Sequence, residues 1–149
     1  MRVQIGVDDT RFYAGRGCDT PPLAVLAVGT RSTAREFFAH DPPTALEIER
    51  AIEAIEDAIM TAGIRAHADA SLYCDAPIVD QIAALDGARG AALPVASVER
   101  MFGRLAAIAL GRPGSADDLP TGAEFAATLT ILREVMQHGG FAAVIGADG

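Results

Sequence analysis

The sequence predicts an α/β (or α+β) fold, a single layered domain over residues 1–149 with about four strands and four to five helices. Two observations lead to this prediction. Segments with the apolar spacing of helices alternate along the chain with short apolar runs typical of strands. The chain of 149 residues also has the usual length of one domain, and 50% of its residues are hydrophobic. One core is therefore expected to hold all of these elements.

The firmest helix prediction covers residues 45–62. Thr44 is followed three residues later by Glu47, which is the capping-box pattern of a helix start. Gly63 supplies a stop signal at the other end. Between them, four isoleucines recur at the spacing of one buried helical face: Ile48, Ile52, Ile55 and Ile59. The pattern predicts that this face lies on the core.

Four further helices are predicted from their end signals. Thr121 and Glu124 make a second capping box, followed by an apolar stripe that ends at glycines 139–140. The other three helices are expected over residues 33–39, 76–85 and about 97–111. Asp75 is the expected N-cap of the second of these.

Four stretches predict strands. Residues 2–7 alternate apolar and other side chains, as a half-buried strand does. Residues 23–28 form a continuous apolar run, which is typical of a strand buried on both faces. The alanine-rich residues 65–73 fit a strand or a connection, and residues 141–145 fit a closing strand after the double glycine.

The charge argues against nucleic acid as a partner. The formal net charge is −8, and all 12 basic residues are arginines that form no basic run. Affinity for DNA or RNA comes largely from neutralising phosphates with Lys and Arg, so a chain this acidic is repelled overall. We expect no nucleic-acid partner.

Composition and hydropathy also allow predictions of oligomerisation, membrane contact and cellular location. A mean hydropathy of +0.25 leaves apolar surface on a small domain, which favours homo-oligomerisation. No apolar run approaches the ~20 residues of a membrane span, so no membrane partner is expected. The N-terminus becomes acidic at Asp8 before any signal-peptide stretch develops, which indicates a cytoplasmic location.

Segment 8–22 is the most suggestive place for chemistry. It lies between two predicted strands, and structureless connections of this length are often functional. Asp8 and Asp9 are candidates for holding a divalent cation or for acid and base catalysis. The candidate ligand-binding residues of the segment are Arg11, Gly15, Arg16, Gly17 and Asp19. Here the arginines would clamp an anion, and the glycines would let backbone amides approach a phosphate.

A hairpin is the simpler interpretation of the same segment. In it the two adjacent aspartates and Thr10 form a turn, residues 12–14 return as a short strand, and residues 15–17 make another turn. Asp, Thr and Gly are ordinary turn residues, so this interpretation needs no ligand.

No family is identified from the sequence. The run Ile-Gly-Val-Asp-Asp-Thr at residues 5–10 resembles the start of the archaeal agmatinyl-cytidine synthetases, but it lacks the further Asp of that family. The adjacent carboxylates also do not fit the Asp-x-Asp-x-Thr motif of haloacid dehalogenase phosphatases. Walker A, Gly-x-Ser-x-Gly and His-Glu-x-x-His motifs are absent from the sequence. Catalytic residues, metal and cofactor therefore stay unassigned.

Two histidines are candidate proton carriers. His40 closes a predicted helix, where the helix dipole favours a histidine for structural reasons alone. His67 lies two residues before Asp69 and close in sequence to Cys74. The functional alternatives for this group are half of a metal site or an acid–base pair.

The predicted helix 45–62 carries carboxylates on one flank: Glu49, Glu53, Glu56 and Asp57. A solvated outer face explains them most simply. The alternatives are contacts with arginines such as Arg100, Arg104 or Arg133 and, least favoured, a metal site.

These observations support two functions. The main interpretation is an accessory, non-catalytic protein that homo-oligomerises and binds a small anionic ligand or a partner protein, because no catalytic motif is present. The alternative is a small metal- or phosphate-dependent enzyme, a hydrolase or transferase, with its site in the 8–22 loop. Such an enzyme would bring Asp8, Asp9 and a histidine together in one cleft.

Overall fold

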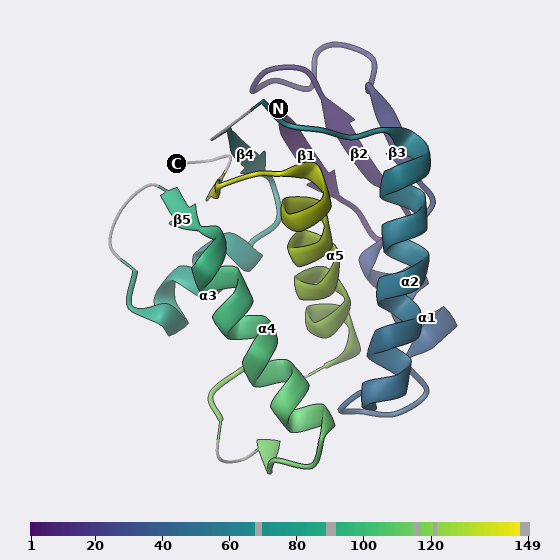
Figure 1. Cartoon of the computed structure of the whole chain (residues 1–149), viewed down its shortest axis with the longest axis vertical. Coiled ribbons are helices and arrows are strands. Elements are labelled where there is room, and N and C mark those ends of the chain that lie inside the picture. The colour runs from purple at the N-terminus through teal and green to yellow at the C-terminus, as the bar shows by residue number, and fades with distance from the viewer. Residues whose placement is uncertain (68–69, 89–91, 115–116, 121, 147–149) are drawn as a thin grey trace.

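The computed structural model describes residues 1–67, 70–88, 92–114, 117–120 and 122–146, and over these ranges it is an α/β domain (Figure 1). Its strands are β1 (Arg2–Ile5), β2 (Thr10–Tyr13), β3 (Ala24–Leu26), β4 (Ser71–Cys74), β5 (Ala92–Pro94) and β6 (Ala143–Gly146). Its helices are α1 (Thr30–Phe37), α2 (Ala45–Ala62), α3 (Ile78–Asp86), α4 (Val95–Ala109) and α5 (Ala123–Gly139). The predicted fold class is confirmed.

The strands form one mixed sheet in the order β3-β2-β1-β4-β6-β5. Strands β1, β4 and β6 pair in parallel, whereas β2 pairs antiparallel with β1 and β3, and β5 pairs antiparallel with β6. Parallel neighbours must be joined by long crossovers, and the helices supply them. The carboxyl ends of β1, β4 and β6 consequently lie along the same edge of the sheet.

Alternate side chains along the strands form the contribution of the sheet to the hydrophobic core. Val3, Phe12, Leu72 and Val144 have no exposed surface and come from four neighbouring strands. Helix α5 packs between α2 and α4 and also contacts α1 and α3 (Figure 1). Its buried residues are Ala126, Ala127, Leu129, Thr130, Ile131, Leu132, Glu134, Val135, Met136 and Gly139. Because these positions surround the helix, α5 is the centre of the helical layer.

Helix α2 follows its sequence signals closely. It begins after Thr44, whose hydroxyl accepts from the backbone amide of Glu47, and it ends at Gly63 in the left-handed conformation. Ile48, Ile55 and Ile59 are buried, while Ile52 is half-buried at the margin of the same face. The predicted bounds, capping box and buried stripe are confirmed.

The sheet is larger than predicted, with six strands among the described residues rather than four. Strand β2 comes from the 8–22 segment, and β5 is only three residues long. The stretch predicted as a strand over 65–73 contains β4 only at its end, Ser71–Cys74. Short strands such as these are held by pairing with distant neighbours, which local apolar patterns do not reveal.

Three helix starts also differ from the prediction. Helix α1 begins at Thr30 after Gly29, not at Thr33, and α3 is preceded by Pro77 rather than capped by Asp75. Helix α4 starts at Val95, two residues before the predicted position. Thr121, half of the second predicted capping box, lies outside the described residues. Tertiary contacts therefore decide where these helices begin.

The start of α1 is fixed by the turn between β1 and β2. The backbone amide of Thr30 donates to the carbonyl of Gly6 (2.9 Å), and those of Arg31 and Ser32 donate to the carbonyl of Val7 (2.9 and 3.1 Å). Gly29 is the point of closest approach, because a Cβ there would lie 2.6 Å from backbone atoms of Val7. This turn therefore takes the place of a side-chain cap.

The two cysteines are both free, with Cys74 buried in β4 and Cys18 exposed. Burial raises the pKa of the Cys74 thiol to about 11. None of the helices in the described part of the chain combines the length and apolarity needed to cross a membrane.

We expect Gly29→Ala to lower the free energy of unfolding by about 1–3 kcal/mol, because the added methyl group overlaps backbone that cannot move independently. Gly103→Ala in the middle of α4 is the matched control. A Cβ there meets nothing within 4 Å, so the helix propensity of alanine should raise stability by about 0.5–1 kcal/mol. Urea unfolding of both variants measures the two changes in stability. Equal changes would contradict the close packing of Gly29 against the turn between β1 and β2.

Candidate functional site

A crevice of about 610 Å³ opens where the inner strands end. Gln4, Ile5 and Gly6 line it at the end of β1, and Asp75 and Ala76 line it just after β4. In open α/β sheets, ligands bind outside the carboxyl ends of the strands, where neighbouring connections diverge. The topology therefore selects this crevice as the candidate site.

The first turns of three helices border the same crevice. Thr30 begins α1, Ile78 begins α3, and Glu124 lies in the first turn of α5. A helix start carries partial positive charge and backbone amides without partners inside the helix, which favours anions. At α1 the carbonyls of the β1–β2 turn already occupy these amides. The starts of α3 and α5 are therefore the ones that face the crevice as anion receptors.

Two carboxylates line the crevice, Asp75 and Glu124. Asp75 Oδ1 lies 2.5 Å from Nη2 of Arg2, but this buried oxygen accepts no hydrogen bond with proper geometry among the described residues. The side chain of Glu124 is 60% exposed and lies 3.5 Å from Arg31. One carboxylate is thus held at the floor and the other stands at the rim.

The crevice offers hydroxyl and amide groups, and the arginines beside it, Arg2 and Arg31, pair with its own carboxylates. Thr30, Thr128 and Gln81 line it, whereas no arginine does among the described residues, and the chain contains no lysine. An anionic ligand would therefore rely on helix starts and on a cation that it brings along. The chemistry that fits this lining is the binding of phosphate together with a divalent metal ion.

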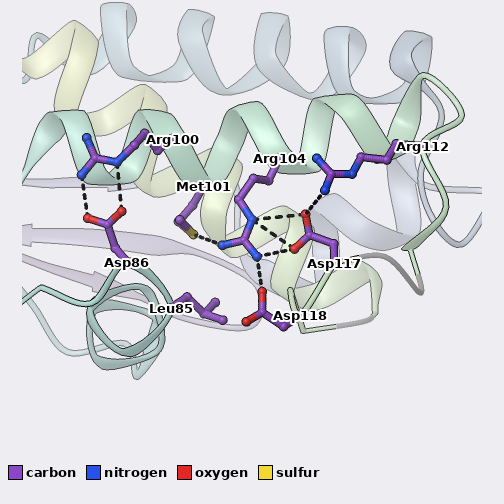
Figure 2. Close-up of a pocket in the computed structure, with 8 residues that line it drawn as sticks. All are labelled: Leu85, Asp86, Arg100, Met101, Arg104, Arg112, Asp117 and Asp118. Atoms are coloured by element: carbon purple, nitrogen blue, oxygen red, sulfur yellow. Dashed lines mark hydrogen bonds and ion pairs between the residues drawn. The ribbon is translucent and has the colours of Figure 1, made fainter.

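A second hollow, of about 760 Å³, lies between α3, α4 and the connection after α4 (Figure 2). Asp86 at the end of α3 accepts from Arg100 at 2.9 and 2.6 Å and from the hydroxyl of Ser97 at 2.6 Å. The hydrogen bonds from Arg100 and Ser97 hold the pKa of Asp86 at about 2. This pair joins α3 to α4.

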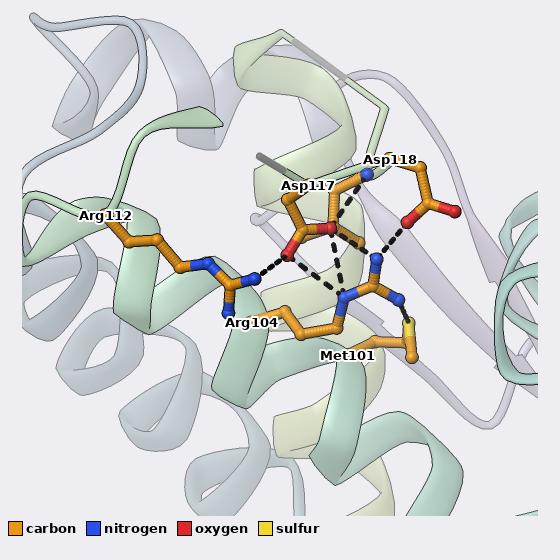
Figure 3. A network of polar contacts seen from close by, with 6 residues as sticks. Met101, Arg104, Arg112, Asp117 and Asp118 are labelled. Carbon is orange, nitrogen blue, oxygen red and sulfur yellow. Dashed lines mark hydrogen bonds and ion pairs between the residues drawn. The ribbon is translucent and has the colours of Figure 1, made fainter. Parts of the chain in front are cut away.

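Arg104 is the centre of the rest of that hollow (Figure 3). Its guanidinium donates to Asp117 and Asp118 and reaches the sulfur of Met101 at 3.4 Å. Arg112 lies 4.0 Å from the same Asp117, and the hydrogen bonds from Arg104 lower the pKa of that carboxyl. The arginines lining the hollow pair with carboxylates of the chain itself. They therefore stabilise the fold and are not available to bind an anion.

The structure divides the 8–22 segment into a hairpin and a loop. Asp9 closes the turn by accepting from the amide of Gly6 through its carbonyl, and its carboxylate pairs with Arg11 at 2.9 Å. Asp8 is exposed in the same turn. Arg16 stacks over the ring of Tyr73 at 4.6 Å from its centroid. The geometry matches the hairpin interpretation of this segment.

The remaining candidates of that segment lie in the loop after β2. Gly15 has a left-handed φ of 71°, and Gly17 and Asp19 are exposed. Neither these residues nor Asp8, Asp9, Arg11 and Arg16 line the crevice. As ligand-binding or catalytic residues they stay predictions.

The two candidate histidines lie apart from the aspartate pair. His40 Nδ1 is 3.2 Å from Glu47, which also accepts from the backbone amides of Thr44 (2.9 Å) and Ala39 (2.6 Å). The Thr44 amide is the main reason that the pKa of Glu47 falls to about 2, and His40 adds to it. His67 is exposed, while Asp69 lies outside the described residues. His40 therefore joins the end of α1 to the start of α2.

The carboxylates of α2 also separate. Glu49, Glu53 and Asp57 are exposed, as a solvated face requires. Glu56 instead lies 3.5 Å from His138 of α5. The arginines proposed as partners pair elsewhere: Arg100 with Asp86, Arg104 with Asp117 and Asp118, and Arg133 with Glu99 and Glu134.

Solved structures with the same fold include members of the Ppx/GppA protein family and an exopolyphosphatase-like protein. The Aquifex aeolicus Ppx/GppA phosphatase, type II variant, matches with a TM-score of 0.76 and 18% identity over 98% of this chain and 52% of that chain. Another structure of the Aquifex aeolicus member of the Ppx/GppA protein family gives 0.72 and 18%, over 97% and 50%. An exopolyphosphatase-like protein gives 0.65 and 15%, over 97% and 54%. The chain thus spans about half the length of each.

Sequence comparison adds no assignment, because no protein-family model matches the chain and no curated protein matches it. The structural likeness at this level of identity establishes the fold. It also contradicts the main interpretation from sequence, an accessory non-catalytic protein, since the structures that share the fold are named as phosphatases.

Asp86 makes the stability of the protein depend on pH. Its folded-state pKa of about 2 lies below the unfolded value of about 3.9. The ionised carboxylate therefore contributes stability above about pH 4, and this contribution is lost as the pH falls through the folded pKa. We expect Asp86→Asn to lower the free energy of unfolding at pH 6, and the difference from wild type to shrink toward pH 2.

Urea unfolding at a series of pH values measures this difference. Glu53→Gln is the control, because Glu53 is an exposed carboxylate of α2 whose removal should change little at any pH. A difference between wild type and Asp86→Asn that stays constant down to pH 2 would rule out the ion pair as its source.

Proposed function

We propose that the chain is a phosphate-hydrolysing domain that binds a phosphoanhydride or phosphoester in the crevice at the carboxyl ends of β1 and β4. The observation that carries the proposal is the meeting of these strand ends with the starts of α3 and α5. The fold shared with Ppx/GppA phosphatases supports it. Inorganic polyphosphate is the first substrate to test, because one matched structure is described as exopolyphosphatase-like.

The lining supports phosphate as the ligand in two ways. The starts of α3 and α5 present positive partial charge to the crevice, and Thr30 adds a hydroxyl group that can meet a phosphate oxygen. Hydrolysis of a phosphoryl group depends mainly on positioning and on stabilising charge, so this lining needs no covalent nucleophile.

A divalent cation fits the same lining. Oδ1 of Asp75 is buried and lies 2.5 Å from Arg2 without the geometry of a hydrogen bond, and Glu124 lines the same crevice from the first turn of α5. Mg²⁺ is held in many phosphate sites by one or two carboxylates together with substrate phosphates, and it neutralises their charge. Asp75 and Glu124 would hold the ion, whose charge would add to that of Arg2 and Arg31, the arginines that pair with them.

We expect Mg²⁺-dependent release of inorganic phosphate from polyphosphate. Asp75→Asn and Glu124→Gln should each lower kcat/KM by roughly tenfold or more, the size of effect expected when a metal site is damaged. A phosphate-release assay with and without Mg²⁺ measures both changes. Asp75→Asn changes the floor of the crevice, and Glu124→Gln changes its rim. Only Asp75→Asn also weakens the contact with Arg2, so a loss of activity in both variants cannot be caused by that contact alone.

Asp57→Asn is the matched control, because Asp57 is exposed on α2 and does not line the crevice. Its activity should equal that of wild type. Activity that survives in both crevice variants, or the absence of any phosphate release and of any thermal shift with Mg²⁺ and phosphate, would refute the proposal.

A further inference from the structure

Three potential metal ligands meet where α2 packs on the last turns of α5. Glu56 comes from α2, and Glu134 and His138 come from α5, four residues apart and therefore on one face. One ligand atom from each lies within 4.8 Å of the other two. None of its three residues lines the crevice, whose last lining residue on α5 is Thr128, about 9 Å before Glu134 along the helix axis.

Both carboxylates point at the same nitrogen. Oε2 of Glu134 lies 3.0 Å and Oε1 of Glu56 lies 3.5 Å from Nε2 of His138. Ligands of a tetrahedral ion at about 2.0–2.2 Å are about 3.3–3.6 Å from one another. The two distances to Nε2 are close to these values and all three ligand atoms lie within 4.8 Å of one another, so side-chain movements would let one ion contact all three atoms. A single proton on Nε2, in contrast, can align well with only one of the two carboxylates.

The charge of the surroundings favours a cation. Glu134 is 1% exposed, and its other oxygen accepts from Arg133 at 2.7 Å. Arg133 is also shared with Glu99 at 3.2 Å. Three carboxylates thus face one guanidinium and one imidazole, which leaves the cluster negative whether His138 is neutral or charged. A divalent ion would balance this charge.

The contacts around the ligands resemble the support of a metal site. Arg133 fixes the oxygen of Glu134 that points away from His138, as outer partners of metal ligands do. The side chains of Glu56 and His138 are 38% and 30% exposed, so an ion can enter and keep water on its open side. One imidazole and two carboxylates suit a divalent first-row ion.

We propose that Glu56, Glu134 and His138 form a zinc site that ties α2 to α5. The ion takes the place of the shared proton at Nε2, coordinates one oxygen of each carboxylate, and completes its shell with water. Because the site exists only when the two helices are packed, zinc binds the folded state and stabilises it. The site needs no substrate and does not depend on the function proposed for the crevice.

The test uses the whole chain with Cys18→Ser, since an exposed thiol is itself a zinc ligand. After removal of metal with a chelator, titration calorimetry should show one zinc per chain, and saturating zinc should raise Tm by about 5 °C or more. His138→Gln should abolish this rise, and Glu56→Gln should weaken zinc binding by roughly tenfold or more. Both side chains are partly exposed, so these variants are expected to fold.

His40→Gln is the matched control. It removes the other histidine that contacts a glutamate, at 3.2 Å, where no third ligand completes a cluster in the described part of the chain. Zinc affinity should be unchanged in this variant. The proposal is overturned if wild type binds no zinc, if His138→Gln keeps the thermal shift, or if His40→Gln loses it to the same extent.

Discussion

The burial of α5 on nearly all sides constrains the rest of the structure. It lies between α2 and α4 and contacts α1 and α3, so every helix takes its position from it. Buried polar groups on α5 must therefore find partners locally. The hydroxyl of Thr130 donates to the carbonyl of Ala126 at 2.7 Å, and Glu134 is held by Arg133 and His138. The start of the same helix enters the crevice, and its end carries the Glu–His cluster.

The elements that could be predicted from sequence are those whose signals are local. Helix α2 has a capping box, a four-isoleucine stripe and a terminal glycine, and its bounds were predicted correctly. Strand β2 was expected only in the hairpin interpretation of segment 8–22, and β5 was not expected because it is three residues long and its partner β6 is far along the chain. The start of α1 was misplaced because a backbone turn, rather than a side chain, satisfies its amides. Long-range contacts decide each of these features.

The crevice could not be predicted for a related reason. The sequence patterns predict that Asp75 and Glu124 both lie at helix starts. This local structural role explains both residues, so the patterns indicate no site there. Tertiary packing brings the two starts to one place, because α3 follows β4 beside β1 and α5 packs against α1 and α3. In the Glu–His cluster, the carboxylate pattern of α2 favours a solvated flank for Glu56, and no motif in the sequence singles out His138. The spacing of four residues between Glu134 and His138 also places both on one helix face, and it was the available signal.

The two edges of the sheet bear on how copies of this protein could associate. Strands β3 and β5 are each three residues long, and β5 ends in Pro94, which has no backbone donor. A strand from another molecule could form few backbone hydrogen bonds with either edge, so growth by edge-to-edge addition is disfavoured. The exposed side chains of Leu23 and Val25 on and beside β3 can still be covered by a facing surface. The homo-oligomer that composition favours would thus be assembled by burial of side chains rather than by extension of the sheet.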